Sequence, residues 1–217
     1  MATEYENGNA AQAALANALI DRGLNPEDRL VGFDSVAAEA LANVINGDIP
    51  TGAEAVAAGA GTAGSGGFLE TAVERIGALI RTTILLDLTG LASSAAGDII
   101  GLAAGGAAYL TQITAARNGT IIAGYVQCLE TPAGGEPAID LFAATPATGE
   151  YDDAISGLAG QAALMDAGAD WTGILAPKSL TAMPAANAHL YAVASGGGDA
   201  AAYTGGKFAI VLYGQPA

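Results

Sequence analysis

Hydrophobic and polar positions alternate along much of the chain after residue 67. The clearest run spans residues 79–91, in which Ile84, Leu86 and Leu88 occupy every second position, the period of a strand with one buried face. Shorter runs separated by Gly, Pro and Asn predict further strands at 98–102, 109–115, 120–130, 138–143, 189–194 and 207–213. Asn118-Gly119 lies between two of these runs and predicts a tight β-hairpin.

Several short strands with turn residues between them predict a mainly β protein. The expected architecture for residues 67–217 is an antiparallel β-sandwich, with the jelly roll as one form of it. Residues 153–166 are an exception, because Ile155, Leu158 and Ala162 follow helical spacing. There we expect a short helix or a long excursion carried on the sandwich.

The first 66 residues follow a different pattern and predict an N-terminal arm of short helices and extended chain. Residues 9–22 place alanine and leucine on one helical face, Asn25-Pro26 is a helix start, and residues 35–46 end at an Asn-Gly stop. Residues 51–67 are rich in Gly and Ala and predict a connector, unless a neighbour packs on it. The arm and linker therefore occupy 1–66 and the sandwich 67–217.

Composition limits the size of the core. Hydrophobic residues make up 52% of the 217 residues, but 52 of them are alanine, so the core is expected to be thin or shared between subunits. The formal net charge is −15. Such a charge repels phosphate backbones and argues against nucleic acid as a partner.

The inventory of reactive side chains predicts no enzyme, metal or cofactor. His189 and Cys128 are the only residues of their types, which excludes an internal disulfide and a zinc ligand set. The acids near Glu150 and Asp152 fit a solvated turn better than a catalytic pair. Those between Asp166 and Asp170 lack the pattern of a calcium loop, and a cation held between subunits by such Asp residues stays an open alternative. The glycines of 59–67 lack the Gly-Lys-Ser/Thr sequence that ends a phosphate loop.

Four aromatic residues are candidates for an interface or a glycan-contact surface. They are Trp171, Tyr191, Tyr203 and Tyr213, and aromatic side chains beside Gly and Thr on β loops can form such platforms. The alternative for each is packing inside the sandwich.

No membrane association is expected from the sequence. The N-terminus carries Glu4 and Glu6 before any apolar run, unlike a secretory signal. The longest weakly polar run, 91–110, is mostly Ala, Gly and Ser and contains Asp98, unlike a membrane span.

The second domain resembles structural proteins of marine tailed bacteriophages, including those that infect cyanobacteria. The resemblance is carried by IRTTILLDLTGL, GDIIG, TQITAARNGTIIAG, CLETPAGGEPAIDLFAATPATGEYDDAI, HLYAVASG and YTGGKFAIVLYG. It implies a virion component made in the host cytoplasm. A capsid decoration (cement) protein on the outside of the head is the expected form, with the major capsid protein and further copies of itself as partners.

By analogy with sandwiches that decorate icosahedral shells, we expect a homotrimer. The alternative function is a receptor- or glycan-binding β module of a head or tail fibre. A virion glycosidase and the major shell subunit itself are weaker alternatives, since the chain lacks a convincing catalytic pair and is short for a shell protein.

Overall fold

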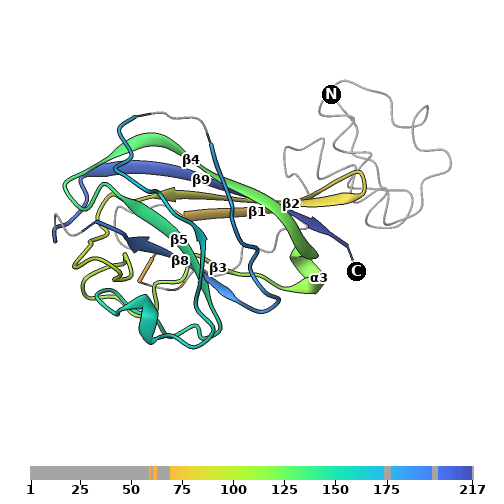
Figure 1. The fold of residues 1–217 in the computed structure, drawn as a ribbon, viewed down its shortest axis with the longest axis horizontal. Coiled ribbons are helices and arrows are strands. Elements are labelled where there is room, and N and C mark those ends of the chain that lie inside the picture. The colour runs from red at the N-terminus through yellow and green to blue at the C-terminus, as the bar shows by residue number, and fades with distance from the viewer. Residues whose placement is uncertain (1–58, 60, 63–68, 174–176, 197–199, 217) are drawn as a thin grey trace, which may run out of the picture. The chain divides into compact units, whose positions relative to one another are not determined.

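A computed structural model describes residues 59, 61–62, 69–173, 177–196 and 200–216 (Figure 1). The chain divides into two units, residues 1–52 and 53–217, and the description below concerns the second. The three N-terminal helices expected from the sequence lie outside the described residues.

Nine strands, one short α-helix and one 3-10 turn make up the described fold, which is mainly β as expected. In chain order they are β1 (Leu69–Ile76), β2 (Leu79–Asp87), β3 (Thr111–Gln112), α3 (Ala115–Asn118), β4 (Thr120–Ala133), β5 (Ile139–Ala144), η2 (Ile155–Gly157), β6 (Ala162–Met165), β7 (Lys178–Ser179), β8 (His189–Ala194) and β9 (Gly205–Gln215).

The strands form two antiparallel sheets with the pairing of a jelly roll. The larger sheet has the order β1-β2-β9-β4-β7 and the smaller one β3-β8-β5-β6. The pairs β2 with β9, β3 with β8, β4 with β7 and β5 with β6 are all antiparallel. Among the eight strands β2 to β9, the first therefore pairs with the last, the second with the last but one, and so on. This nested pairing results when an eight-stranded antiparallel ribbon is rolled up. Strand β1 adds a further strand beside β2.

The main core lies between the two sheets. Side chains at alternate positions of β2, β4 and β9 pack against those of β5, β6 and β8 in one buried cluster, which includes Ile84, Cys128, Leu141, Leu190 and Ile210. This arrangement confirms the sandwich expected from the alternating pattern.

Loops cover the outer face of the smaller sheet. Tyr191 and Val193 of β8 pack there with Ile99, Ala108 and Ile155 from the covering loops. All six residues of β8 are buried as a result. The expected strand at 98–102 is part of this cover, where it forms only isolated bridges.

Part of the expected connector is packed on the sandwich. Gly59 N–H donates to the Tyr109 carbonyl at 3.0 Å, and Gly61 N–H donates to the Ala107 carbonyl at 3.0 Å. Gly59, Gly61 and Thr62 are buried. A connector was expected at 51–67 unless a neighbour packs on it. At Gly59, Gly61 and Thr62 the neighbouring segment 107–109 does pack on the chain.

The prediction of a β-hairpin at Asn118-Gly119 is wrong. Strand β3 pairs with β8 in the smaller sheet, whereas β4 pairs with β9 and β7 in the larger one. Asn118 is the last residue of α3 and Gly119 is its C-cap, with φ 70°. The Asn118 side chain is buried; it accepts a hydrogen bond from Thr114 N–H and donates one to Thr82 Oγ1, both at 2.8 Å. The Asn118-Gly119 dipeptide therefore lies where the chain passes from the smaller sheet to the larger one.

Other elements differ in length or type from the expectations. Of the short helix or long excursion expected at 153–166, the structure has only the short 3-10 helix η2, and β6 follows as a strand where helical spacing had been predicted to continue. Strand β2 ends at Asp87, whose carboxylate accepts hydrogen bonds from the N–H and hydroxyl of Thr89 and so turns the chain. Strands β1 and β7 were not expected, while β5, β8 and β9 were found within two residues of their predicted bounds.

Candidate functional site

Trp171, the first of the four aromatic candidates, is fully buried. Its indole Nε1–H donates to the Ile139 carbonyl at 3.0 Å, and its ring meets Phe208 edge-on at 5.3 Å between centroids. Lys178 Nζ lies 4.6 Å from the ring centroid. Trp171 thus contributes to the core between the sheets.

Tyr191 and Tyr203 are buried as well. The Tyr191 hydroxyl donates to the Pro146 carbonyl at 2.8 Å, and the Tyr203 hydroxyl donates to the Glu136 carbonyl at 2.8 Å. Burial raises the pKa of both phenols, that of Tyr203 well above the usual range. The expectation that these residues form a contact surface is therefore corrected: they hold loops to the sandwich.

Tyr213 is the one residue of the four that lies at the surface. It projects from β9 on the outer face of the larger sheet, paired across the strands with Arg81 of β2 and Ala123 of β4. The strand register places it in a regular lattice of outward side chains. That face is the candidate interaction surface of the described fold.

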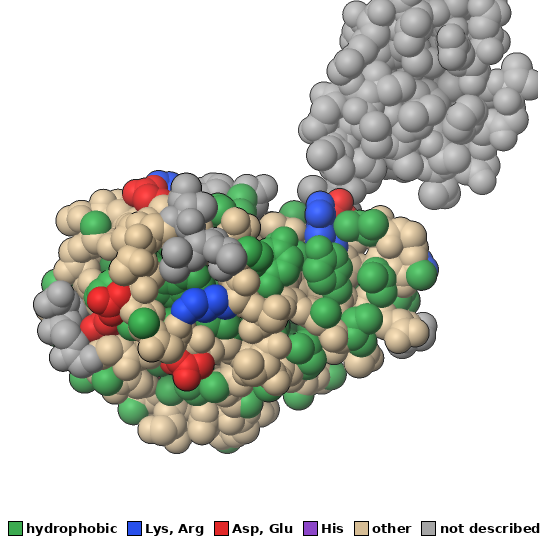
Figure 2. Space-filling model, turned by 45° about the horizontal axis from the view of Figure 1, so that its top comes forward, with side chains coloured by type: hydrophobic (Ala, Val, Ile, Leu, Met, Phe, Trp, Pro, Cys, Tyr) green, Lys and Arg blue, Asp and Glu red, His purple; other side chains and the backbone are tan. Residues whose placement is uncertain are grey.

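The middle of this outer face carries mainly small or apolar side chains. One cross-strand row consists of Ala72, Thr83, Val211 and Tyr125, and the next contains Leu85, Ala209 and Gln127. Most are half-buried and Val211 is buried. In Figure 2, hydrophobic side chains are spread over the visible surface and charged ones form a few separate patches. We call this outer face, between the rows of Arg81 and Lys207, the sheet face.

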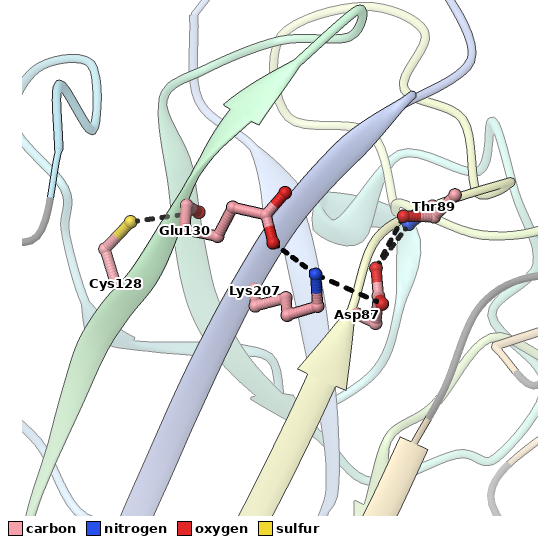
Figure 3. A network of polar contacts seen from close by, with 5 residues as sticks. All are labelled: Asp87, Thr89, Cys128, Glu130 and Lys207. Carbon is pink, nitrogen blue, oxygen red and sulfur yellow. Dashed lines mark hydrogen bonds and ion pairs between the residues drawn. The ribbon is translucent and has the colours of Figure 1, made fainter.

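An ion-pair network closes one end of the sheet face (Figure 3). Lys207 of β9 lies between Asp87 of β2, at 3.7 Å, and Glu130 of β4, with which it also forms a close pair. Burial by itself would raise the pKa of Asp87, but the two hydrogen bonds from Thr89 and the charge of Lys207 outweigh it and lower that pKa. The hydrogen bond to Glu130 raises the pKa of Lys207.

A depression of about 250 Å³ adjoins this network. Its lining consists of Leu85, Leu86, Asp87, Leu129, Lys207 and Phe208. Leu129 is 40% exposed, which is unusual for a large aliphatic side chain on a strand. The depression is smaller than the ordinary range of small-molecule pockets, roughly 300–1,000 Å³.

The opposite end of the sheet face is the turn between β1 and β2. Glu74 and Arg81 form an ion pair across these strands. Ile76 lies on the same face of β1 as Glu74 and is 45% exposed, whereas Arg75 is exposed on the opposite face of that strand. Arg75 Nε donates to the Gly77 carbonyl at 3.4 Å within the turn. This end of the face therefore offers an exposed aliphatic side chain, and the other end an apolar depression.

The remaining reactive residues occupy structural positions. Cys128 is buried in the core and its thiol contacts the Glu130 carbonyl at 3.2 Å. His189 Nδ1 lies 2.9 Å from the Thr145 carbonyl, and its ring meets Tyr109 edge-on. Among the described residues there is no cluster of three or more potential metal ligands, and no helix in that part of the chain has the length and apolar character to cross a membrane.

A second polar cluster fastens the segment after β6 to the sandwich. Asp140 accepts a hydrogen bond from Ala167 N–H at 2.7 Å, and Lys178 donates to the Ala167 carbonyl. Burial raises the pKa of Asp140. These contacts hold the segment that carries Trp171 against the sandwich, with the Trp171 side chain in the core.

Comparisons with protein-family models, with curated proteins and with solved structures found no match for this chain. The resemblance to phage structural proteins therefore stays a prediction. What the sequence analysis missed was the sheet face itself, because Ala, Thr and Tyr at outward positions gave no motif. The register of β2, β9 and β4 brings them together.

The network at Asp87 makes stability depend on pH in a defined direction. Because its folded pKa is lowered from 3.8, Asp87 stabilises the fold above that pH, and the stabilisation is lost as pH falls through the folded value. We expect Asp87→Asn to lose less stability than the wild type between pH 6 and pH 3, by up to about 1 kcal/mol. Urea unfolding at both pH values measures this, and equal losses in the two proteins would contradict it.

Proposed function

We propose that this protein is a non-enzymatic structural component of a virion, most specifically a head decoration (cement) protein on the capsid surface. The observation that carries the proposal is the sheet face, an array of mainly small and apolar side chains with charged groups at its ends. Surfaces of this kind suit protein–protein contact. The proposed partners are the major capsid protein and further copies of the chain, in a homotrimer.

Fold and charge add support of a weaker kind. Jelly rolls occur in viral capsid domains, although they also occur in lectins and in enzymes, so the fold alone does not decide the function. The net charge of −15 keeps many copies soluble at high local concentration. The proposed mechanism is mechanical: many modest interfaces, repeated over the shell, sum to a large stabilisation.

The alternative, a glycan-binding module of a fibre, loses its main support. Three of the four aromatic residues on which it depended are buried. Tyr213 and Tyr125 remain half-buried on the sheet face, where they serve a protein interface equally well.

The test is co-sedimentation of the purified full chain with capsids that lack it, together with its copy number in intact particles. A decoration protein is expected at on the order of hundreds of copies per particle, because each symmetry-related site on the shell takes one set. Binding to glycans without binding to capsids would support the fibre alternative. Absence from particles and from capsid pellets would end the proposal.

A further inference from the structure

The Asn118-Gly119 pair consists of two residues that the fold requires and that are chemically reactive in this order. Gly119 has φ 70°, and a Cβ added there would overlap the Gln215 carbonyl oxygen, so glycine alone fits. Asn118 supplies two hydrogen bonds, to Thr114 and Thr82. In an unfolded chain, asparagine before glycine is readily deamidated, because glycine leaves the following backbone nitrogen unhindered.

Deamidation of such a pair is an intramolecular displacement followed by hydrolysis. The backbone nitrogen of Gly119 gives its proton to a base in the solvent and forms a bond to Cγ of Asn118. The Cγ–Nδ2 bond breaks, and the leaving nitrogen takes up a proton and departs as ammonia. Water then opens the resulting succinimide ring at one of its two carbonyl groups. One product is aspartate; in the other, isoaspartate, the main chain runs through Cβ and Cγ.

The folded chain holds every group that this reaction needs. Gly119 N–H donates to the Ala115 carbonyl at 3.0 Å, so its proton is engaged. Asn118 Oδ1 accepts from Thr114 N–H and Nδ2 donates to Thr82 Oγ1, both at 2.8 Å. These two bonds fix the side chain, which would have to turn toward the Gly119 nitrogen. Asn118 is also fully buried, which keeps away the water that hydrolysis consumes.

We propose that Asn118 is a deamidation site that folding closes. It reacts while the chain is unfolded or locally open, and it is protected in the native sandwich. In the native chain the reaction proceeds only through the fraction of molecules in which α3 has separated from β2 and β9. The inference concerns the chemistry of the chain and does not rest on the proposed function.

A chain that is deamidated before it folds is unable to rebuild this junction. Aspartate places a carboxylate in a fully buried position and removes the hydrogen bond that Nδ2 donates to Thr82 Oγ1. Isoaspartate lengthens the main chain and leaves a free carboxylate where the Asn118 backbone carbonyl lies. That carbonyl packs so closely on Gly214 that a Cβ added to Gly214 would overlap its oxygen. Deamidated chains are therefore expected to be excluded from the folded population.

The experiment compares deamidation of the full chain in native buffer and in guanidinium chloride, both at pH 8. Digestion after aromatic residues keeps Asn118 inside one peptide, and chromatography with mass spectrometry resolves its asparagine, aspartate and isoaspartate forms. Asn118 is expected to react on the order of a hundredfold more slowly in the native chain, because opening is rare. Asn7-Gly8 and Asn46-Gly47 are further pairs of this kind, and in guanidinium chloride they give the matched intrinsic rate. Equal rates at Asn118 in the two solvents overturn the proposal.

Thr82→Val tests the contact that holds the leaving nitrogen. It removes the acceptor of Asn118 Nδ2 and is expected to raise the native rate about tenfold, the effect of one hydrogen bond, without changing the rate in guanidinium chloride. Thr83→Val is the matched control, because Thr83 points to the sheet face in the register of β2 with β9. Circular dichroism confirms that both variants are folded. If the two variants deamidate Asn118 at the same native rate, the protection does not come from these contacts and the proposal fails.

Refolding tests the fate of the modified chain. Chain that has been partly deamidated in guanidinium chloride is returned to native buffer, and size exclusion separates folded from aggregated protein. The folded fraction is expected to retain asparagine at position 118, and the aggregated fraction to be enriched in aspartate and isoaspartate there. The same proportions in both fractions would show that the junction accepts the products, contrary to the proposal.

Discussion

Replacing Trp171 with alanine is expected to lower the free energy of unfolding by about 4 kcal/mol. The side chain is fully buried, donates a hydrogen bond to the Ile139 carbonyl and packs edge-on against Phe208. Its removal leaves a cavity between the sheets, strips the Ile139 carbonyl of a donor and takes away the ring under Lys178. All three effects destabilise the fold.

Chemical denaturation followed by circular dichroism measures this loss, because Trp171 is the single tryptophan and its fluorescence disappears with the substitution. Trp171→Phe is the matched control. It keeps most of the apolar volume and loses the indole hydrogen bond, so we expect a smaller loss of about 1–2 kcal/mol. A loss below about 1 kcal/mol for Trp171→Ala would mean that this residue does not pack in the core as described.

Replacing Gly119 with alanine is expected to cost about 3 kcal/mol. Gly119 has φ 70°, and a Cβ added there would lie 2.4 Å from the Gln215 carbonyl oxygen. The substitution therefore combines an unfavourable backbone conformation, about 1 kcal/mol, with a clash against the backbone of β9 that forces the two strands apart, about 2 kcal/mol. The measurement is the midpoint of thermal or urea unfolding.

Gly77→Ala separates the two contributions. Gly77 also has a positive φ, 61°, but nothing lies within 4 Å of the position of its added Cβ. This variant should show the conformational cost alone, about 1 kcal/mol. Equal losses at Gly77 and Gly119 would show that the close approach to Gln215 does not limit the packing of β9.

The strands that the sequence predicted best are those with a clear local pattern. In β9, Phe208, Ile210 and Leu212 point into the core while Lys207, Ala209 and Tyr213 point outward, and this alternation is visible in the printed sequence. Strand β8 was found at its expected bounds although both of its faces are buried. For β8, a run of residues that favour β structure was sufficient to predict the bounds of the strand.

The failures occurred where local preference competes with distant contacts. Asn118-Gly119 favours a two-residue hairpin in isolation, yet Asn118 is held by Thr82, 36 residues earlier in the chain. Residues 162–165 have helical spacing, but they form β6 because β5 offers them a free edge. Such pairings depend on strands that are remote in sequence, and periodicity within one window does not contain them.

For the candidate site, the sequence pointed to four aromatic residues, of which only Tyr213 lies at the surface. Aromatic residues were expected to mark a contact surface, but composition does not show which side of a strand faces the core once a bulge or a loop intervenes. Trp171 lies in a loop that Lys178 and Asp140 fasten over the core. The sheet face, by contrast, consists of residues that are unremarkable one at a time.

By itself, the sequence determined the mainly β class, the strand content of the second domain and the strongly acidic character, because alternation, turn residues and charge are local properties of the chain. The tertiary structure alone decided the nested pairing of β2 to β9, the burial of Trp171, Tyr191 and Tyr203, and the assembly of the sheet face. These features depend on which strands become neighbours, and that choice is made by the burial of whole faces against one another, which no short segment encodes.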